Sequence, residues 1–160
     1  MAGLKSKLAA ILTVVLIVSG CLKIAGRLPA KLRLKVISAE SHCPSLSKTS
    51  SALWFENPEQ AGHVLGGMKI PADLSPNNGL LFISMGLQPS GGFSISLARP
   101  TAELKNDTAF VDVLWQRPPP GSLVTQALTS PCLLLEMEKA RFHTIVIRDQ
   151  DGNIRAAIKN

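Results

Sequence analysis

The sequence predicts a mainly β fold, an antiparallel β-sandwich or barrel-like domain with one short helix, behind an N-terminal lipoprotein signal. Closely spaced strand-like runs fill the second half of the 160-residue chain, and turn-forming Gly, Pro and Asn residues separate them. A single segment carries both start and stop signals of a helix. Long helices do not alternate with the strand-like runs, and this argues against a parallel α/β sheet.

The first residues have the layout of an export signal. Two lysines precede an apolar run, Leu8–Val18, which is too short to cross a hydrocarbon core of about 30 Å. The run ends in Val-Ser-Gly-Cys, which resembles the bacterial lipobox and implies cleavage after Gly20 and lipidation, palmitate included, of Cys21. Leu22 follows, which in this class implies transport to the outer membrane, facing the periplasm or the cell surface. The alternative is an ordinary secretory signal with a chance cysteine.

Cleavage divides the chain into a signal peptide (1–20), a basic tether (21–32) and a single β-rich domain (33–160). The formal net charge of +6 falls to +4, because the signal holds two lysines and no acidic residue. A basic tether beside a lipid anchor is attracted to anionic head groups by about 1 kcal/mol per charge. Aromatic residues do not interleave with these charges, so no nucleic-acid partner is predicted. The cations near the anchor are Lys23, Arg27 and Lys31 in the tether, followed by Arg33 and Lys35 at the start of the domain.

Period-two alternation predicts a first strand in which Leu32, Leu34 and Val36 face the core. Further strands are expected at 80–83, 93–97, 110–115, 132–137, 144–147 and 154–158.

The helix is predicted to begin after Asn57, a residue suited to the N-cap, with proline at the first helical position. Gly66-Gly67 provides the stop, so the helix has about ten residues. Ala61, Val64 and Leu65 are available to face a core.

With Cys21 lipidated, Cys43 and Cys132 remain. They could form one disulfide in the oxidising envelope, worth about 3 to 4 kcal/mol in the chain-entropy model. Alternatively, both could be buried, reduced thiols in strands. The sequence leaves the two open.

Residue patterns of the common hydrolases, phosphate-binding loops and CxxC pairs are absent, so no catalytic residue, cofactor or metal is predicted. His42 and Cys43 are adjacent and would point to opposite faces of a strand, which makes them a poor dyad. Residues 149–153, Asp-Gln-Asp-Gly-Asn, resemble the opening of a calcium loop. The twelfth position is Asn160 instead of Glu, so a hairpin turn is favoured.

Two stretches, residues 85–93 and 115–129, are candidates for binding a partner. The first is a Gly-rich turn, which allows close backbone approach, and the second holds a stiff proline segment, which loses little entropy on docking. The alternative is that both are ordinary strand connections. The candidate residues are Pro89, Ser90, Gly91, Gly92, Phe93, Trp115, Arg117, Pro118, Pro119 and Pro120.

Together these stretches resemble the C-terminal domain family of the protease complex subunit PrcB. The resemblance rests on a strand ending at Gly86, the turn Pro-Ser-Gly-Gly-Phe-Ser-Ile at 89–95, Pro-Gly at 120–121, and Val-Thr-Gln-Ala-Leu-Thr-Ser-Pro at 124–131. It covers about residues 70–147. Phe93 stands where Tyr is usual, and Cys132 replaces an aromatic or aliphatic residue.

The resemblance implies a non-catalytic envelope protein that assembles with or stabilises an exported protease. A second hypothesis is a protease inhibitor, because residues 89–93 also resemble a loop of chagasin-type inhibitors. The Arg-Pro-Trp order of those inhibitors is absent, since Trp115 precedes Arg117.

Overall fold

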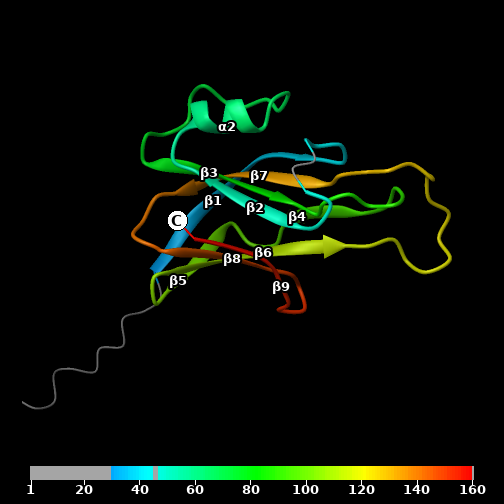
Figure 1. Cartoon of the computed structure of the whole chain (residues 1–160). Coiled ribbons are helices and arrows are strands. Elements are labelled where there is room, and N and C mark those ends of the chain that lie inside the picture. The colour runs from blue at the N-terminus through cyan, green and yellow to red at the C-terminus, as the bar shows by residue number, and fades with distance from the viewer. Residues whose placement is uncertain (1–29, 45–46, 160) are drawn as a thin grey trace, which may run out of the picture.

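A computed structural model describes residues 30–44 and 47–159 (Figure 1). The predicted signal, the lipidation site Cys21 and the tether up to residue 29 lie outside the described residues. None of the described helices is long and apolar enough to cross a membrane.

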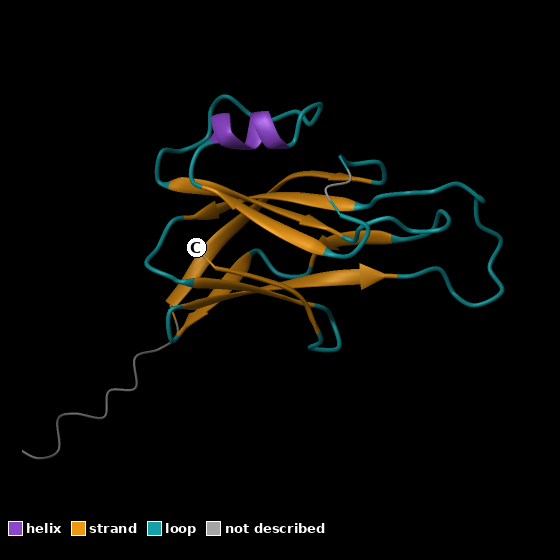
Figure 2. Ribbon diagram, in the orientation of Figure 1, coloured by secondary structure: helices purple, strands orange, loops and turns teal. Residues whose placement is uncertain are grey.

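The described residues form a curled sheet with one short helix beside it, so the mainly β prediction is confirmed (Figures 1 and 2). The strand order is β2-β3-β7-β1-β5-β6-β8-β9, and β4 pairs with β6 outside this path. The two ends of the order meet, because the Ser50 hydroxyl donates to the Arg155 carbonyl beside it at 2.9 Å. The sheet is therefore a nearly closed barrel. Its elements are β1 (Ala30–Glu40), β2 (Ser51–Phe55), α2 (Pro58–Val64), β3 (Asn78–Ser84), β4 (Ser94–Leu97), β5 (Thr101–Lys105), β6 (Thr108–Gln116), β7 (Cys132–Glu138), β8 (Thr144–Arg148) and β9 (Ile154–Lys159).

The sheet is mixed, which corrects the expectation of a purely antiparallel one. Strands β6 and β8 run parallel, with Thr108 opposite Thr144 and Asp112 opposite Arg148. After β6 the chain crosses to β7 between β3 and β1, and then returns. The chain reverses direction once on entering β7 and again on entering β8, so β8 lies beside β6 and runs in the same direction.

Strand β3 is buried on both faces, which explains its nearly continuous apolar sequence. Leu81 and Ile83 pack inside the barrel, whereas Leu80 and Phe82 pack into a second apolar cluster that includes Ala61 of α2 and Leu65 just after it. The helix covers this outer face in Figure 2. Complete burial of such side chains contributes about 1.5 to 3 kcal/mol each.

Helix α2 begins as predicted, because the Asn57 side chain accepts a hydrogen bond from the Gln60 N–H at 3.0 Å. Ala61 and Leu65 are fully buried, but Val64 is 45% exposed, contrary to expectation. The helix has seven residues and is shorter than predicted. Val64 is its last residue and is exposed there.

Strand β1 begins at Ala30, so the last residues assigned to the tether belong to the sheet. Leu32 and Leu34 are buried as predicted, but Val36 is 45% exposed. The pairing of β1 with β7 shifts between Val36 and Ser38, and this irregularity ends the alternation that predicted an inward Val36.

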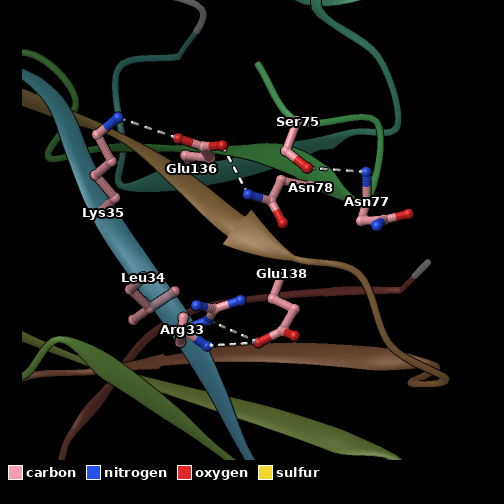
Figure 3. A pocket seen from close by; sticks show the side chains of 8 residues that line it. All are labelled: Arg33, Leu34, Lys35, Ser75, Asn77, Asn78, Glu136 and Glu138. Atoms are coloured by element: carbon pink, nitrogen blue, oxygen red, sulfur yellow. Dashed lines mark hydrogen bonds and ion pairs between the residues drawn. The ribbon is translucent and has the colours of Figure 1, made fainter. Parts of the chain in front are cut away.

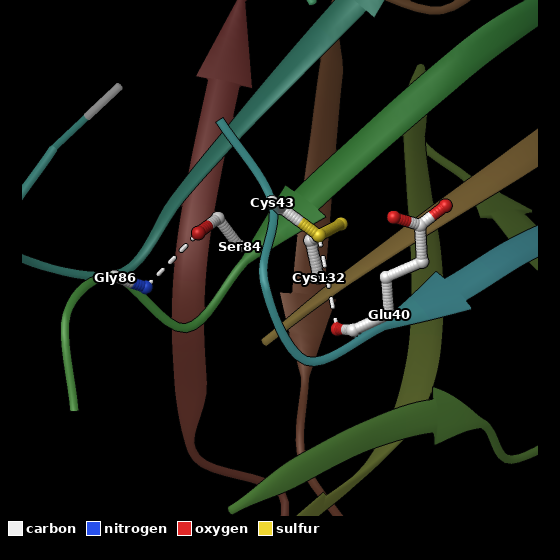
Figure 4. The surroundings of a disulfide bond; sticks show 5 residues. All are labelled: Glu40, Cys43, Ser84, Gly86 and Cys132. Carbon is white, nitrogen blue, oxygen red and sulfur yellow. Dashed lines mark hydrogen bonds between the residues drawn. A yellow bond between two sulfur atoms is a disulfide. The ribbon is translucent and has the colours of Figure 1, made fainter. Parts of the chain in front are cut away.

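Cys43 and Cys132 form a disulfide, with Cα atoms 6.0 Å apart (Figure 4). Cys132 is the first residue of β7, and Cys43 lies in the segment after β1. Backbone hydrogen bonds join the same segments, from Cys43 N–H to the Ser130 carbonyl at 3.1 Å and from Ser130 N–H to the Ser41 carbonyl at 2.9 Å. The disulfide therefore fixes the point at which the chain enters β7.

Replacing both cysteines, Cys43→Ala with Cys132→Ala, should lower the free energy of unfolding by about 3 to 5 kcal/mol. The disulfide connects residues 89 apart and removes much of the loop-closure entropy of the unfolded chain. Urea unfolding of both proteins, with and without reductant, measures this. Reductant should destabilise the wild type and leave the stability of the variant unchanged. Equal stability of wild type and variant without reductant would contradict the prediction.

Candidate functional site: two paired loops

Two loops lie next to each other at the end of the barrel opposite the start of β1 (Figure 1). The Gly-Gly loop (residues 85–93) joins β3 to β4, and the proline loop (residues 117–131) joins β6 to β7. Strands β3 and β7 are antiparallel neighbours, and Ser84 lies opposite Cys132. The end of β3 therefore adjoins the start of β7, and the two loops leave the sheet together.

Hydrogen bonds continue the β3–β7 pairing into both loops. They run from Met85 N–H to the Pro131 carbonyl (2.9 Å), from Gln88 N–H to the Thr129 carbonyl (2.8 Å), from Thr129 N–H to the Gln88 carbonyl (3.0 Å) and from Gly91 N–H to the Thr125 carbonyl (2.8 Å). The Thr129 hydroxyl also donates to the Ser90 carbonyl at 2.8 Å. The loops thus form one connected structure.

Gly92 of the Gly-Gly loop lies directly against the proline loop. Its φ is +83°, and an added Cβ would lie 2.9 Å from Cβ of Pro118 and 3.1 Å from Cγ1 of Val124. A side chain at this position is therefore disfavoured both by backbone conformation and by lack of space. Gly91 differs, since its added Cβ would make an ordinary contact of 3.5 Å with Thr125.

The proline loop bends at Pro119–Ser122. The Ser122 N–H donates to the Pro119 carbonyl at 3.1 Å, and the Ser122 hydroxyl donates to the same oxygen at 2.7 Å. Pro120 and Gly121, with a φ of +77°, occupy the central positions that suit a type II turn. The proline run therefore shapes a defined, outward turn.

Three leucines expose apolar surface on these loops. Leu123 is fully exposed, Leu128 is 68% exposed and Leu87 is 39% exposed. Exposed apolar side chains on a loop pair of fixed shape are typical of a protein-contact surface. These leucines are not among the candidates predicted from the sequence, because nothing in their sequence context distinguishes them from core leucines.

The candidate residues from the sequence divide into two groups. The exposed candidates on the paired loops are Pro89, Gly92, Arg117, Pro119 and Pro120. The half-buried candidates are Ser90, Gly91, Phe93 and Pro118. Of these, Phe93 packs against the barrel core. Trp115 is only 6% exposed and lies in that core, with the Arg155 guanidinium 5.4 Å from its ring centre. Its ring therefore offers little surface to a partner.

The turn after β8 is a hairpin turn, as favoured from the sequence, and its carboxylate is used internally. Asp149 is buried and accepts hydrogen bonds from the N–H groups of Asp151 and Asn153, both at 2.9 Å. Arg155 forms an ion pair with the same carboxylate. Burial alone would raise the pKa of Asp149, but the hydrogen bonds from Asn153, Arg155 and Asp151 outweigh it and lower this pKa from 3.8 to about 2.

A polar groove of about 460 Å³ lies elsewhere, on the outer face of β1, β3 and β7 (Figure 3). Its two carboxylates already have partners. Glu136 accepts a hydrogen bond from the Asn78 amide at 2.7 Å and lies 3.7 Å from the Lys35 ammonium. Glu138 lies 3.6 Å from the Arg33 guanidinium. The groove therefore presents neutralised charge pairs.

The described cysteines and histidines do not gather into a site for nucleophilic or metal chemistry. Cys43 and Cys132 are joined, so neither offers a thiolate. His42, His63 and His143 are all exposed. Across residues 30–44 and 47–159, no cluster of three potential metal ligands occurs.

Residues 80–138 match the family model described as PrcB C-terminal. The match covers less than half of the chain, and no curated protein or solved structure matches it significantly. The PrcB C-terminal match begins in β3 and ends with β7, so it contains both paired loops and all the hydrogen bonds between them. The expected family resemblance is thus confirmed for the part of the chain that builds the candidate site.

Replacing the close-approach glycine of this segment, Gly92→Ala, should lower the free energy of unfolding by about 1 to 3 kcal/mol, because the methyl group meets Pro118 and the backbone is left-handed. Chemical denaturation measures the loss. Gly91→Ala is the matched control and should change stability by less than about 1 kcal/mol. Gly121→Ala, which is left-handed but has open space around it, separates the backbone cost from the steric overlap. Equal effects of Gly91→Ala and Gly92→Ala would contradict the geometry.

Replacing the buried carboxylate, Asp149→Asn, should destabilise the protein at neutral pH and have less effect in acid. A carboxylate with a lowered folded pKa stabilises fully above its unfolded value near 3.8, and this contribution is lost as pH falls toward about 2. Denaturation at pH 7 and near pH 2 measures the difference between wild type and variant. Asp151→Asn is the control. If the difference in free energy of unfolding between wild type and Asp149→Asn is the same at pH 7 and near pH 2, the lowered pKa does not belong to Asp149.

Proposed function

We propose that this chain is a non-catalytic, lipid-anchored accessory subunit that binds an exported protease in the bacterial envelope. The PrcB C-terminal match supports association with a protease complex. The observation that carries the proposal is the pairing of the two loops inside the matched segment, with apolar side chains exposed on both.

The loops suit protein recognition for a physical reason. Binding costs free energy whenever loops must be ordered, and loops already joined by hydrogen bonds lose less conformational entropy. Exposed leucines on such a frame can fill pockets of a partner and exclude water. The accessory role is thus assigned to this end of the barrel.

Lipid anchoring is part of the same proposal and rests on the sequence. Residues 18–21 resemble the lipobox, and Cys21 would carry the lipid, with Leu22 favouring the outer membrane. Metabolic labelling with palmitate tests it: wild type should incorporate label and Cys21→Ser should not. An unlabelled wild-type chain would remove the anchor from the proposal and leave the loop assignment standing.

Affinity capture of the C-terminally tagged full chain from its native envelope, with mass spectrometry, tests the partner. We expect an exported protease in stoichiometric amount. An active protease in the complex would support the accessory role, whereas an inhibited protease would favour the inhibitor hypothesis on the same loops. Recovery of no partner after gentle crosslinking would contradict both.

Introducing charge on the proline loop, Leu123→Asp with Leu128→Asp, should lower recovery of the partner by about tenfold or more, as expected when apolar contacts at an interface are lost. Leu123 is fully exposed in the free protein, so its replacement should leave the melting temperature nearly unchanged. Val64→Asp on helix α2, at a residue 45% exposed, is the matched control and should retain the partner. Normal recovery with both loop changes would exclude the loops as the contact surface.

A further inference from the structure

The end of the barrel opposite the paired loops is the end at which the described chain begins. Strand β1 starts here at Ala30, which lies opposite Leu104 of β5. The β5–β6 turn, the start of β8 and the end of β9 lie along the same edge (Figure 1). The residues in register across it are Ala30 with Leu104, Lys105 with Thr108, Thr108 with Thr144, and Thr144 with Lys159. We call this edge, with the β7–β8 loop (residues 139–143), the entry end.

The entry end carries cations that are not neutralised. Lys31, Lys105, Arg141 and Lys159 are exposed, and none forms an ion pair with another described residue. Neighbouring strands are about 4.8 Å apart, so the row from β1 to β9 extends about 20 Å. The cations are therefore spread over a surface and not gathered at a point.

The acidic residues near this end change its charge little. Glu56, Glu103 and Glu138 each lie within 4.0 Å of a lysine or arginine. Asp107, in the β5–β6 turn, is exposed and forms no ion pair with a described residue. The cations without partners thus outnumber the carboxylate without a partner.

The sequence before Ala30 brings this surface close to the proposed anchor. The stretch from residue 21 to residue 30 reaches at most about 30 Å when fully extended, and it contains Lys23 and Arg27. Charges act on a lipid surface within about 8 to 10 Å at physiological ionic strength. A tether of this length allows the entry end to reach that distance.

We propose that the entry end docks on anionic phospholipid head groups of the membrane that holds the anchor, so that the paired loops point away from it. This orientation rests on the proposed lipidation of Cys21. Strand β6, with nine residues, separates the two ends by about 30 Å. Contact at the entry end therefore leaves Leu123 and Leu128 free for a protein partner.

The test uses the full chain, processed in a bacterial envelope, purified and mixed with vesicles. One set is phosphatidylcholine alone, and the other is equal parts phosphatidylcholine and phosphatidylglycerol. Hydrogen exchange is followed in the β5–β6 turn (105–108), the β7–β8 loop (139–143) and the proline loop. With phosphatidylglycerol we expect exchange about tenfold slower at the first two segments, unchanged exchange at the third, and loss of the effect in high salt.

The charge reversals Lys105→Glu with Arg141→Glu should abolish the slowing. Lys48→Glu with Lys69→Glu is the matched control, with the same change in net charge at exposed cations that form no ion pair with a described residue, and it should retain the effect. Equal exchange in the two vesicle types, or equal effects of the two charge reversals, would overturn the docking proposal.

Flotation with pure phosphatidylcholine vesicles reports the anchor separately, because it needs no anionic lipid. A chain that floats there without slowed exchange in the anionic vesicles has an anchor but no docking surface, which overturns the inference alone. A chain that fails to float contradicts the anchor and the orientation together.

Discussion

The pairing of β3 with β7 is the interaction on which the other features depend. It runs from Asn78 opposite Glu138 to Ser84 opposite Cys132, and it continues as hydrogen bonds to Gly91 and Thr125 in the loops. Strand β7 also pairs with β1, so the same strand connects the barrel, the cluster beneath α2 and the candidate site. The disulfide lies at the junction between sheet and loops. Loss of this pairing would remove the core and the site together.

The strands that the sequence predicted are those whose side-chain pattern reflects local burial. Leu80–Ile83 is apolar throughout because both faces of β3 are covered, and Asn57 specifies the helix start through its own side chain. Strands β2 and β5 were not predicted. Strand β5, Thr-Ala-Glu-Leu-Lys, consists largely of residues with weak strand preference, and its pairing with β1 and β6 determines its conformation. The parallel β6–β8 pair depends on a chain crossing that no local pattern records.

The sequence identified both loops of the candidate site but not their contact. Gly91-Gly92 and the three prolines are recognisable as local turn and stiffening signals. Their contact follows from the register of β3 against β7, which is a property of the assembled sheet. For the same reason Trp115 was a candidate although it lies in the core, and Leu123 and Leu128 were overlooked although they are exposed.

The molecule thus has two ends of different chemistry: a cationic end where β1 begins, and an apolar, hydrogen-bonded loop pair at the other. This division depends on the loops being an ordered extension of the sheet. Residue-resolved hydrogen exchange of the free protein tests it at the amides of Gln88, Gly91 and Thr129, which donate between the loops. We expect exchange at all three amides to be slower than in an unstructured chain by at least about a hundredfold. Exchange at the unstructured rate, with β3 and β7 still protected, would contradict it.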